Sequence, residues 1–157
     1  MDFSIVIPVK NEADNIAPLV GEIRAACDGR FDYELIYVDD GSDDATPEAL
    51  RALQVGFPRL RVLRHARNCG QSTGLRTGVR AARADWVLTL DGDGQNDPAD
   101  IPALVERLRA QPNDEPPLQL IMGHRAKRQD SWLRKFSSRV ANGVRSRLLH
   151  DATPTDR

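Results

Sequence analysis

Residues 86–98 of the chain read WVLTLDGDGQNDP. The apolar run 86–90 ends directly in a turn where two aspartates, Asp91 and Asp93, alternate with glycines. A short apolar run that ends in a turn signal is typical of a buried strand in a parallel sheet. Carboxylates this close repel each other unless a cation lies between them. The stretch therefore indicates both a strand and a candidate site.

Strand and helix patterns alternate along the rest of the chain. Further apolar runs predict strands at 3–7, 33–38, 60–63 and 118–122. Apolar residues at helical spacing predict helices capped by Asn11, Thr46 and Asp97, a helix over 71–83, and a long amphipathic helix over 131–149. This alternation predicts an α/β fold, with a mostly parallel sheet covered by helices on both faces.

The ends of the predicted strands are polar. In open parallel sheets, ligands bind beyond the carboxyl ends of the strands. The residues that follow the five strands are Asn11 and Glu12, Asp39 and Asp40, Arg67 and Asn68, Asp91 and Asp93, and His124 and Arg125. Their convergence on one edge of the sheet predicts a binding site there.

Composition and charge limit the class of protein. A chain of 157 residues, 40% hydrophobic and with net charge −1, predicts one globular domain over 1–157. The near-neutral charge exerts no general attraction on nucleic acid, so no nucleic-acid partner is expected. No apolar run approaches the roughly 18 residues of a membrane span, and no secretory signal is visible, so a cytoplasmic location is expected. Cys27 and Cys69 lack metal-ligand spacing and are predicted to be free thiols.

The turn after residue 90 suits a metal ion. Asp91, Asp93 and the amide oxygen of Gln95 are ligands that Mg²⁺ or Mn²⁺ prefers. An EF-hand is excluded because Asn96 and Pro102 stand where that loop requires glycine and glutamate. The alternative is an ordinary turn, since aspartate and glycine are good turn formers.

Other motifs carry weaker signals. Asp39 and Asp40 suit a ribose or a base edge, although they also suit a simple turn. The chain has neither a Gly-x-Gly-x-x-Gly fingerprint nor a P-loop, so phosphates must be held by a cation and arginines. Gly70, Gly74 and Gly78 predict close packing of a helix on the sheet.

The segment 124–147 is strongly basic and contains one acidic residue, Asp130. Its amphipathic pattern suits an anionic membrane surface or a phosphate-bearing ligand, and a solvated helix face is the alternative. His65 and His150 are predicted to fill ordinary structural positions.

Together these motifs resemble the family 2 glycosyltransferases. The segments that carry the resemblance are 5–8 with 11–12, 38–43, 67–71, 90–98 and 123–125, in the order found in that family. The resemblance implies the GT-A fold, a Rossmann-like nucleotide-sugar-binding domain. The Asp-x-Asp-x-Gln-x-x-Pro pattern and the basic segment are similar to the branch of dolichyl-phosphate mannose synthase and bacterial polyprenyl-phosphate glycosyltransferases.

The resemblance also implies roles for individual residues. It implies that nucleoside contacts come from Pro8, Glu12, Asp39 and Asp40, that Asp91 and Asp93 are catalytic and hold Mg²⁺ or Mn²⁺ with Gln95, and that Arg125 and Arg134 bind the acceptor phosphate or the leaving diphosphate. The implied reaction is inverting transfer of a sugar from a UDP- or GDP-sugar to a polyprenyl phosphate, such as undecaprenyl or dolichyl phosphate, with peripheral contact at the cytoplasmic face of a membrane. The alternatives are a glycan or other hydroxyl acceptor, or a nucleotide-sugar-binding module without turnover. The family normally continues with a C-terminal acceptor segment, which this chain is expected to lack.

Overall fold

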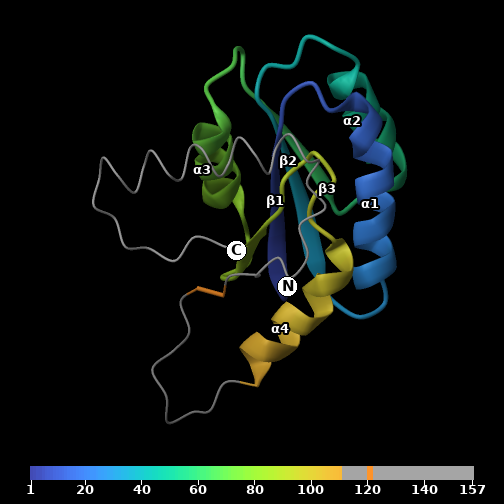
Figure 1. The fold of residues 1–157 in the computed structure, drawn as a ribbon, viewed down its shortest axis with the longest axis vertical. Coiled ribbons are helices and arrows are strands. Elements are labelled where there is room, and N and C mark those ends of the chain that lie inside the picture. Colours follow the sequence, from blue (N-terminus) through green and yellow to red (C-terminus); the bar gives the residue numbers. More distant parts are fainter. Residues whose placement is uncertain (111–119, 122–157) are drawn as a thin grey trace, which may run out of the picture. The chain divides into compact units, whose positions relative to one another are not determined.

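The computed structural model describes residues 1–110 and 120–121 (Figure 1). Contacts divide the chain into two compact units, 1–119 and 120–157. The first unit contains these elements, in chain order: β1 (Phe3–Val9), α1 (Ala13–Cys27), β2 (Tyr33–Asp39), α2 (Thr46–Gly56), β3 (Leu60–Arg64), α3 (Gln71–Ala81), β4 (Val87–Thr89), the 3-10 turn η1 (Pro98–Asp100) and α4 (Ile101–Arg109). The single domain over 1–157 stays a prediction.

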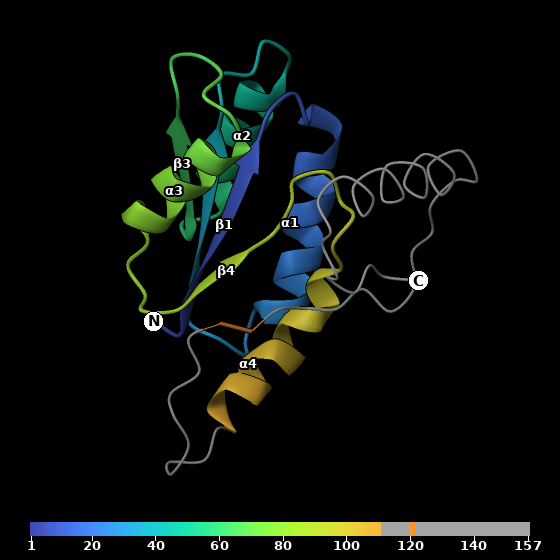
Figure 2. The ribbon, with the colours of Figure 1, turned by 60° about the vertical axis from the view of Figure 1, so that its left-hand side comes forward.

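The four strands form one parallel sheet in the order β3-β2-β1-β4 (Figure 2). In the register, Ile5 of β1 lies beside Leu35 of β2 on one side and Leu88 of β4 on the other. The order places β1 and β2 at the centre, and all seven residues of β2 are buried. The predicted α/β fold with a parallel sheet is confirmed.

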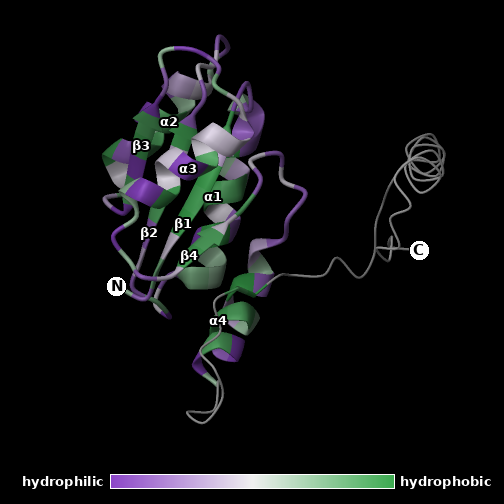
Figure 3. Ribbon diagram, turned by 90° about the vertical axis from the view of Figure 1, so that its left-hand side faces the viewer, coloured by the Kyte–Doolittle hydropathy of each residue, from purple (hydrophilic) through white to green (hydrophobic). Residues whose placement is uncertain are grey.

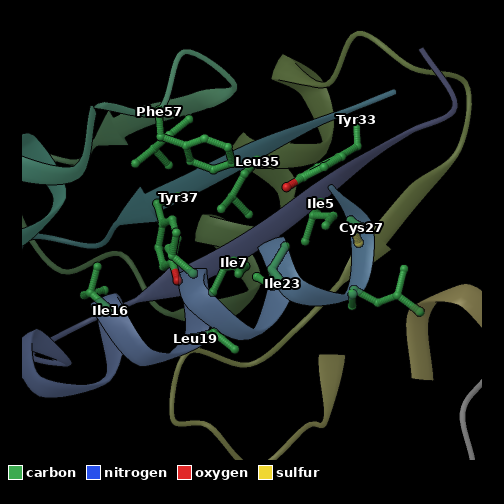
Figure 4. Close-up of a cluster of buried hydrophobic side chains, with 14 of the residues drawn as sticks. Ile5, Ile7, Ile16, Leu19, Ile23, Cys27, Tyr33, Leu35, Tyr37 and Phe57 are labelled. Carbon is green, nitrogen blue, oxygen red and sulfur yellow. The ribbon is translucent and has the colours of Figure 1, made fainter. Parts of the chain in front are cut away.

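Side chains of the strands alternate between two helical layers, as the pleat of a strand requires. Odd-numbered residues of β1, such as Ile5 and Ile7, pack with α1, α2 and α4 in the larger core, part of which Figure 4 shows. Val6 faces the other side, where it packs with Ile36, Val38 and residues of α3. Figure 3 shows β1 largely in the hydrophobic colour. Helices therefore cover both faces of the sheet, as predicted.

Helix α3 packs very closely on the sheet. A Cβ atom at Gly74 would lie 3.0 Å from Cβ of Pro8, and one at Gly78 would overlap Cγ1 of Val6. Glycine thus brings the helix backbone against β1, which confirms the predicted packing role of Gly74 and Gly78.

Two predicted helix caps are wrong. Glu12, not Asn11, occupies the N-cap position of α1. Asn11 has a φ of 57° and its amide donates to Asp43, 2.6 Å away, in the next loop. Thr46 is the first residue of α2, and its hydroxyl accepts from the backbone of Glu12 at 2.8 Å. Both side chains join the loops after β1 and β2, which local capping patterns do not reveal. Asp97 does cap η1, as predicted.

Some predicted elements differ in extent or lie outside the described residues. β4 is shorter than the predicted strand 86–90. Leu120 and Ile121 are not in a strand, and the rest of the predicted strand 118–122 lies outside the described residues, as does the predicted helix 131–149. Among the described helices, none has the length and apolar character needed to span a membrane. Cys27 and Cys69 are free, as predicted.

Candidate nucleotide-sugar site

A pocket lies at the carboxyl ends of β1 and β4, beside the first turns of α3. Its volume is about 130 Å³, and its lining residues are Pro8, Gln71, Ser72, Leu75, Thr89, Leu90 and Asp91. Pro8 is the next-to-last residue of β1, and Asp91 follows β4 by two residues. The structure therefore brings a predicted nucleoside contact and a predicted metal ligand to one pocket, at the edge of the sheet where the sequence places the site.

The Asp91 carboxylate is oriented by neutral amides. Its Oδ1 atom accepts a hydrogen bond from Nε2 of Gln71 at 3.0 Å, and Oδ2 accepts a longer one from Nδ2 of Asn96 at 3.4 Å. An ionised carboxylate offers about four acceptor positions. Two amide donors thus fix the direction of the group while leaving acceptor positions and the full negative charge for a cation.

The turn after Asp91 is packed against β1. A Cβ atom at Gly92 would overlap Cγ1 of Val9, so only glycine lets the turn lie this close to the strand. Beyond it, Asp93 is exposed, and its Oδ1 accepts from the backbone N–H of Gln95 at 3.0 Å. Carboxylate and amide oxygens on a turn anchored in this way fit the donor set that Mg²⁺ or Mn²⁺ requires.

Asp39 is buried at the end of β2. Its Oδ1 accepts from the backbone N–H of Ser42 at 2.8 Å, and its Oδ2 lies 3.0 Å from Nε of Arg64 in an ion pair. The carboxylate therefore ties the end of β2 to its following turn and to β3. The predicted nucleoside contact of Asp39 stays a prediction.

Asp40 is also buried, with 4% of its surface exposed. Its carboxylate accepts from the backbone N–H groups of Cys69 at 2.8 Å and Gly70 at 2.7 Å, and contacts Nδ1 of His65 at 2.7 Å. Burial alone would raise the pKa of Asp40, but the hydrogen bonds from His65, Cys69 and Gly70 outweigh it and lower the pKa. Asp40 thus fixes the loop that leads into α3, and its nucleoside contact stays a prediction.

A second set of potential metal ligands surrounds Asp40. Asp40, His65 and Cys69 each offer one ligand atom, and these three atoms lie within 4.8 Å of one another. Both ring nitrogens of His65 already have partners. Nδ1 contacts Asp40, and Nε2 lies 2.9 Å from the hydroxyl of Thr77. His65 therefore links the end of β2 to α3, in keeping with the structural position predicted for it.

The loops after β2 and β3 also meet through their backbones. Gly41 has a φ of +70°, which L side chains rarely adopt. A Cβ atom there would lie 2.6 Å from the carbonyl carbon of Arg67 and 2.8 Å from the backbone nitrogen of Asn68. Glycine is therefore required for this contact.

The remaining predicted site residues fall into two groups. Glu12 is the N-cap residue of α1 and is partly exposed, and its Oε2 accepts from Nδ2 of Asn15 at 2.6 Å. Arg125 and Arg134 lie outside the described residues. Sequence reasoning included Gln71 in the segment 67–71 but gave it no role, although its place directly after Gly70, at the start of a predicted helix on the site edge, was a usable signal.

The chain belongs to Glycosyl transferase family 2, whose sequence pattern matches residues 4–154. This confirms the family that the motifs resemble. The chain is 40% identical over 143 residues to an undecaprenyl-phosphate 4-deoxy-4-formamido-L-arabinose transferase of Edwardsiella ictaluri, and the match covers 90% of this chain and 42% of that protein. The chain is also 39% identical over 159 residues to a dodecaprenyl-phosphate galacturonate synthase of Rhizobium johnstonii, and this match covers 96% of this chain and 45% of that protein. The chain thus spans less than half the length of these relatives.

Solved structures with the same fold include a mannosyltransferase from Pyrobaculum calidifontis in complex with GDP-Man and Mn²⁺. It aligns with a TM-score of 0.62 and 26% identity, over 71% of this chain and 33% of that one. TarS of S. aureus in complex with UDP-GlcNAc aligns with a TM-score of 0.57 and 22% identity, over 69% of this chain and 32% of that one. The described sheet and helices therefore have the GT-A, Rossmann-like fold that the resemblance implies.

Proposed function

We propose that the chain is the nucleotide-sugar-binding part of a metal-dependent, inverting glycosyltransferase that moves a sugar from a UDP- or GDP-sugar to a polyprenyl phosphate. The observation that carries the proposal is the pocket beyond β1 and β4, where Asp91 lies with its carboxylate oriented by two amides. The names of the two relatives support a polyprenyl-phosphate acceptor. The complex of the mannosyltransferase with GDP-Man and Mn²⁺ supports the donor class and a divalent metal.

Asp91, Asp93 and Gln95 would hold the cation, and Pro8, Glu12, Asp39 and Asp40 would form or support the nucleoside side of the site. When bound, the cation supplies positive charge next to the diphosphate, where negative charge develops as the anomeric C–O bond breaks. We assign Arg125 and Arg134 to the acceptor phosphate or the leaving diphosphate.

A phosphate acceptor explains why the proposed site needs no general base. The acceptor is already an anion at neutral pH, so its oxygen can attack the anomeric carbon without losing a proton. Attack opposite the leaving diphosphate inverts the anomeric configuration. A lipid acceptor also requires the enzyme to act at a membrane surface, and we propose that the protein makes peripheral contact with the cytoplasmic face of a membrane.

The test is a thermal-shift and calorimetric titration with UDP- and GDP-sugars, with and without Mn²⁺. A ligand at 100 times its Kd adds about 2.7 kcal/mol to the free energy of unfolding, so the correct donor should raise the melting temperature clearly. Asp91→Ala should abolish the Mn²⁺-dependent part of donor binding. The matched control is Asp85→Ala, an exposed aspartate in the loop before β4, which should bind like the wild type.

Donor and Mn²⁺ binding to Asp91→Ala as tight as to the wild type would refute the metal assignment. Product formation then decides between acceptors. Transfer to undecaprenyl or dolichyl phosphate supports the proposal, whereas transfer only to a glycan hydroxyl contradicts it.

A further inference from the structure

We infer that Gln71 is a positioning residue for metal binding, which holds the Asp91 carboxylate in the direction required by the cation. This inference rests on the proposed function, because it assigns a role in the same metal site. Gln71 is the first residue of α3 and lines the pocket together with Asp91. Its Nε2 atom donates to Oδ1 of Asp91 at 3.0 Å, across 20 residues of sequence.

An amide is well suited to this task. A lysine or arginine in the same place would orient Asp91 equally well, but would cancel the negative charge that attracts a divalent cation. Gln71 donates a hydrogen bond and carries no charge. Groups that orient the ligands of a metal ion in this way are a general feature of metal sites, and their loss typically weakens metal affinity about 10- to 100-fold.

The backbone of Gln71 is itself held in place. Directly before it, the N–H groups of Cys69 and Gly70 both donate to the buried carboxylate of Asp40. Directly after it, the first turn of α3 closes through hydrogen bonds from Thr73 and Gly74 to the carbonyl of Gly70. The start of α3 is therefore fixed to the end of β2.

The other end of the contact is equally well fixed. Asp91 follows β4, and the backbone N–H of Leu90 donates to the carbonyl of Val6 in β1 at 3.2 Å. Gly74 of α3 in turn packs against Pro8 of β1. The distance between Gln71 and Asp91 is therefore set by the sheet and α3, which makes Gln71 able to select one orientation of the carboxylate.

The test is the substitution Gln71→Met in the full chain. Methionine keeps the length and helix propensity of glutamine and removes the amide donor. The matched control is Gln54→Met, because Gln54 is an exposed glutamine on α2. Binding of Mn²⁺ is measured by electron paramagnetic resonance of the free ion, with UDP or GDP present and absent, and the melting temperature is measured in parallel.

We expect Gln71→Met to weaken Mn²⁺ binding about 10-fold or more while the melting temperature changes by no more than about 2 °C. Gln54→Met should bind Mn²⁺ like the wild type. A second variant, Gln71→Ala, should show the same loss of affinity. A positioning role predicts lower metal affinity at unchanged stability, which a purely structural role does not.

Asp91→Ala separates this inference from the proposed function. If Asp91→Ala weakens Mn²⁺ binding but both Gln71 variants bind like the wild type, the role of Gln71 is refuted and the metal site stands. If Asp91→Ala also binds Mn²⁺ like the wild type, the metal site itself is refuted.

Discussion

Glu34 is costly to bury, because it is a carboxylate with only 2% of its surface exposed. Its Oε1 accepts from the hydroxyl of Ser4 at 2.8 Å and from the backbone N–H of Arg83 at 2.7 Å, and its Oε2 accepts from Nη1 of Arg61 at 2.7 Å. We predict that Glu34→Gln, which changes shape very little, destabilises the fold.

The magnitude follows from the partners. In Glu34→Gln the side-chain oxygen can keep the bonds from Ser4 and Arg83, but the new NH₂ group faces the guanidinium of Arg61, which is also a donor. A hydrogen bond to a charged group contributes about 1.5–3 kcal/mol. Arg61 is partly exposed and keeps its bond to the carbonyl of Ala81, so we expect a loss of about 2 kcal/mol at pH 7.

The loss should depend on pH. Burial alone would raise the pKa of Glu34, but the hydrogen bonds from Arg61, Ser4 and Arg83 outweigh it and hold the pKa below its ordinary value of 4.5. A carboxyl with a lowered pKa in the folded state stabilises the fold fully above its unfolded pKa, and this contribution disappears as the pH falls through the folded pKa. The difference between wild type and Glu34→Gln should therefore be constant above about pH 5.5 and shrink below about pH 4.5.

The assay is urea unfolding followed by circular dichroism between pH 7 and the lowest pH at which the wild type stays folded. Glu22→Gln, an exposed glutamate on α1, is the matched control and should change the free energy of unfolding by less than about 0.5 kcal/mol. The reasoning is wrong if Glu34→Gln costs no more than the control at pH 7, or if its cost stays the same down to the acid limit.

Other predictions concern packing and thiol reactivity. Gly78→Ala should destabilise the fold by about 1–3 kcal/mol, because the new methyl group overlaps Val6. Gly21→Ala, with no atom within 4 Å of the added Cβ and in the interior of α1, should instead stabilise it by about 1 kcal/mol, and urea unfolding of both variants measures the contrast. At pH 8 a disulfide reagent should titrate Cys69 quickly, whereas Cys27 should react only in denaturant, since burial raises the pKa of Cys27 to about 11. Equal reaction of both thiols in the native protein would contradict this.

Much of the fold could be predicted from the sequence, because its strands are continuous apolar runs and its helices have clear apolar faces. The four described strands lie where these runs predict them, with small differences at their ends. The errors at Asn11 and Thr46 have one physical cause. Each side chain meets a partner more than 30 residues away, and a local capping pattern contains no information about such a partner.

Contacts between residues far apart in the sequence limit the prediction of the site even more than that of the fold. The topology of parallel sheets places Pro8 and Asp91 at one edge, so their shared pocket could be predicted. The bond between Gln71 and Asp91 could not, because it depends on how closely α3 lies against β1. Likewise, adjacent aspartates at the end of a strand do not reveal that Asp39 and Asp40 turn their carboxylates into the protein.

The contact between Gly41 and the loop after β3 determines which positions of these two loops can be varied by directed evolution. Gly41 meets main-chain atoms of Arg67 and Asn68, so the contact is independent of the side chain at position 67. Ala66 and Arg67 are exposed and can be randomised in a library while the scaffold beneath them keeps its shape. Position 41 must stay invariant in such a library, because any side chain there would push the two loops apart.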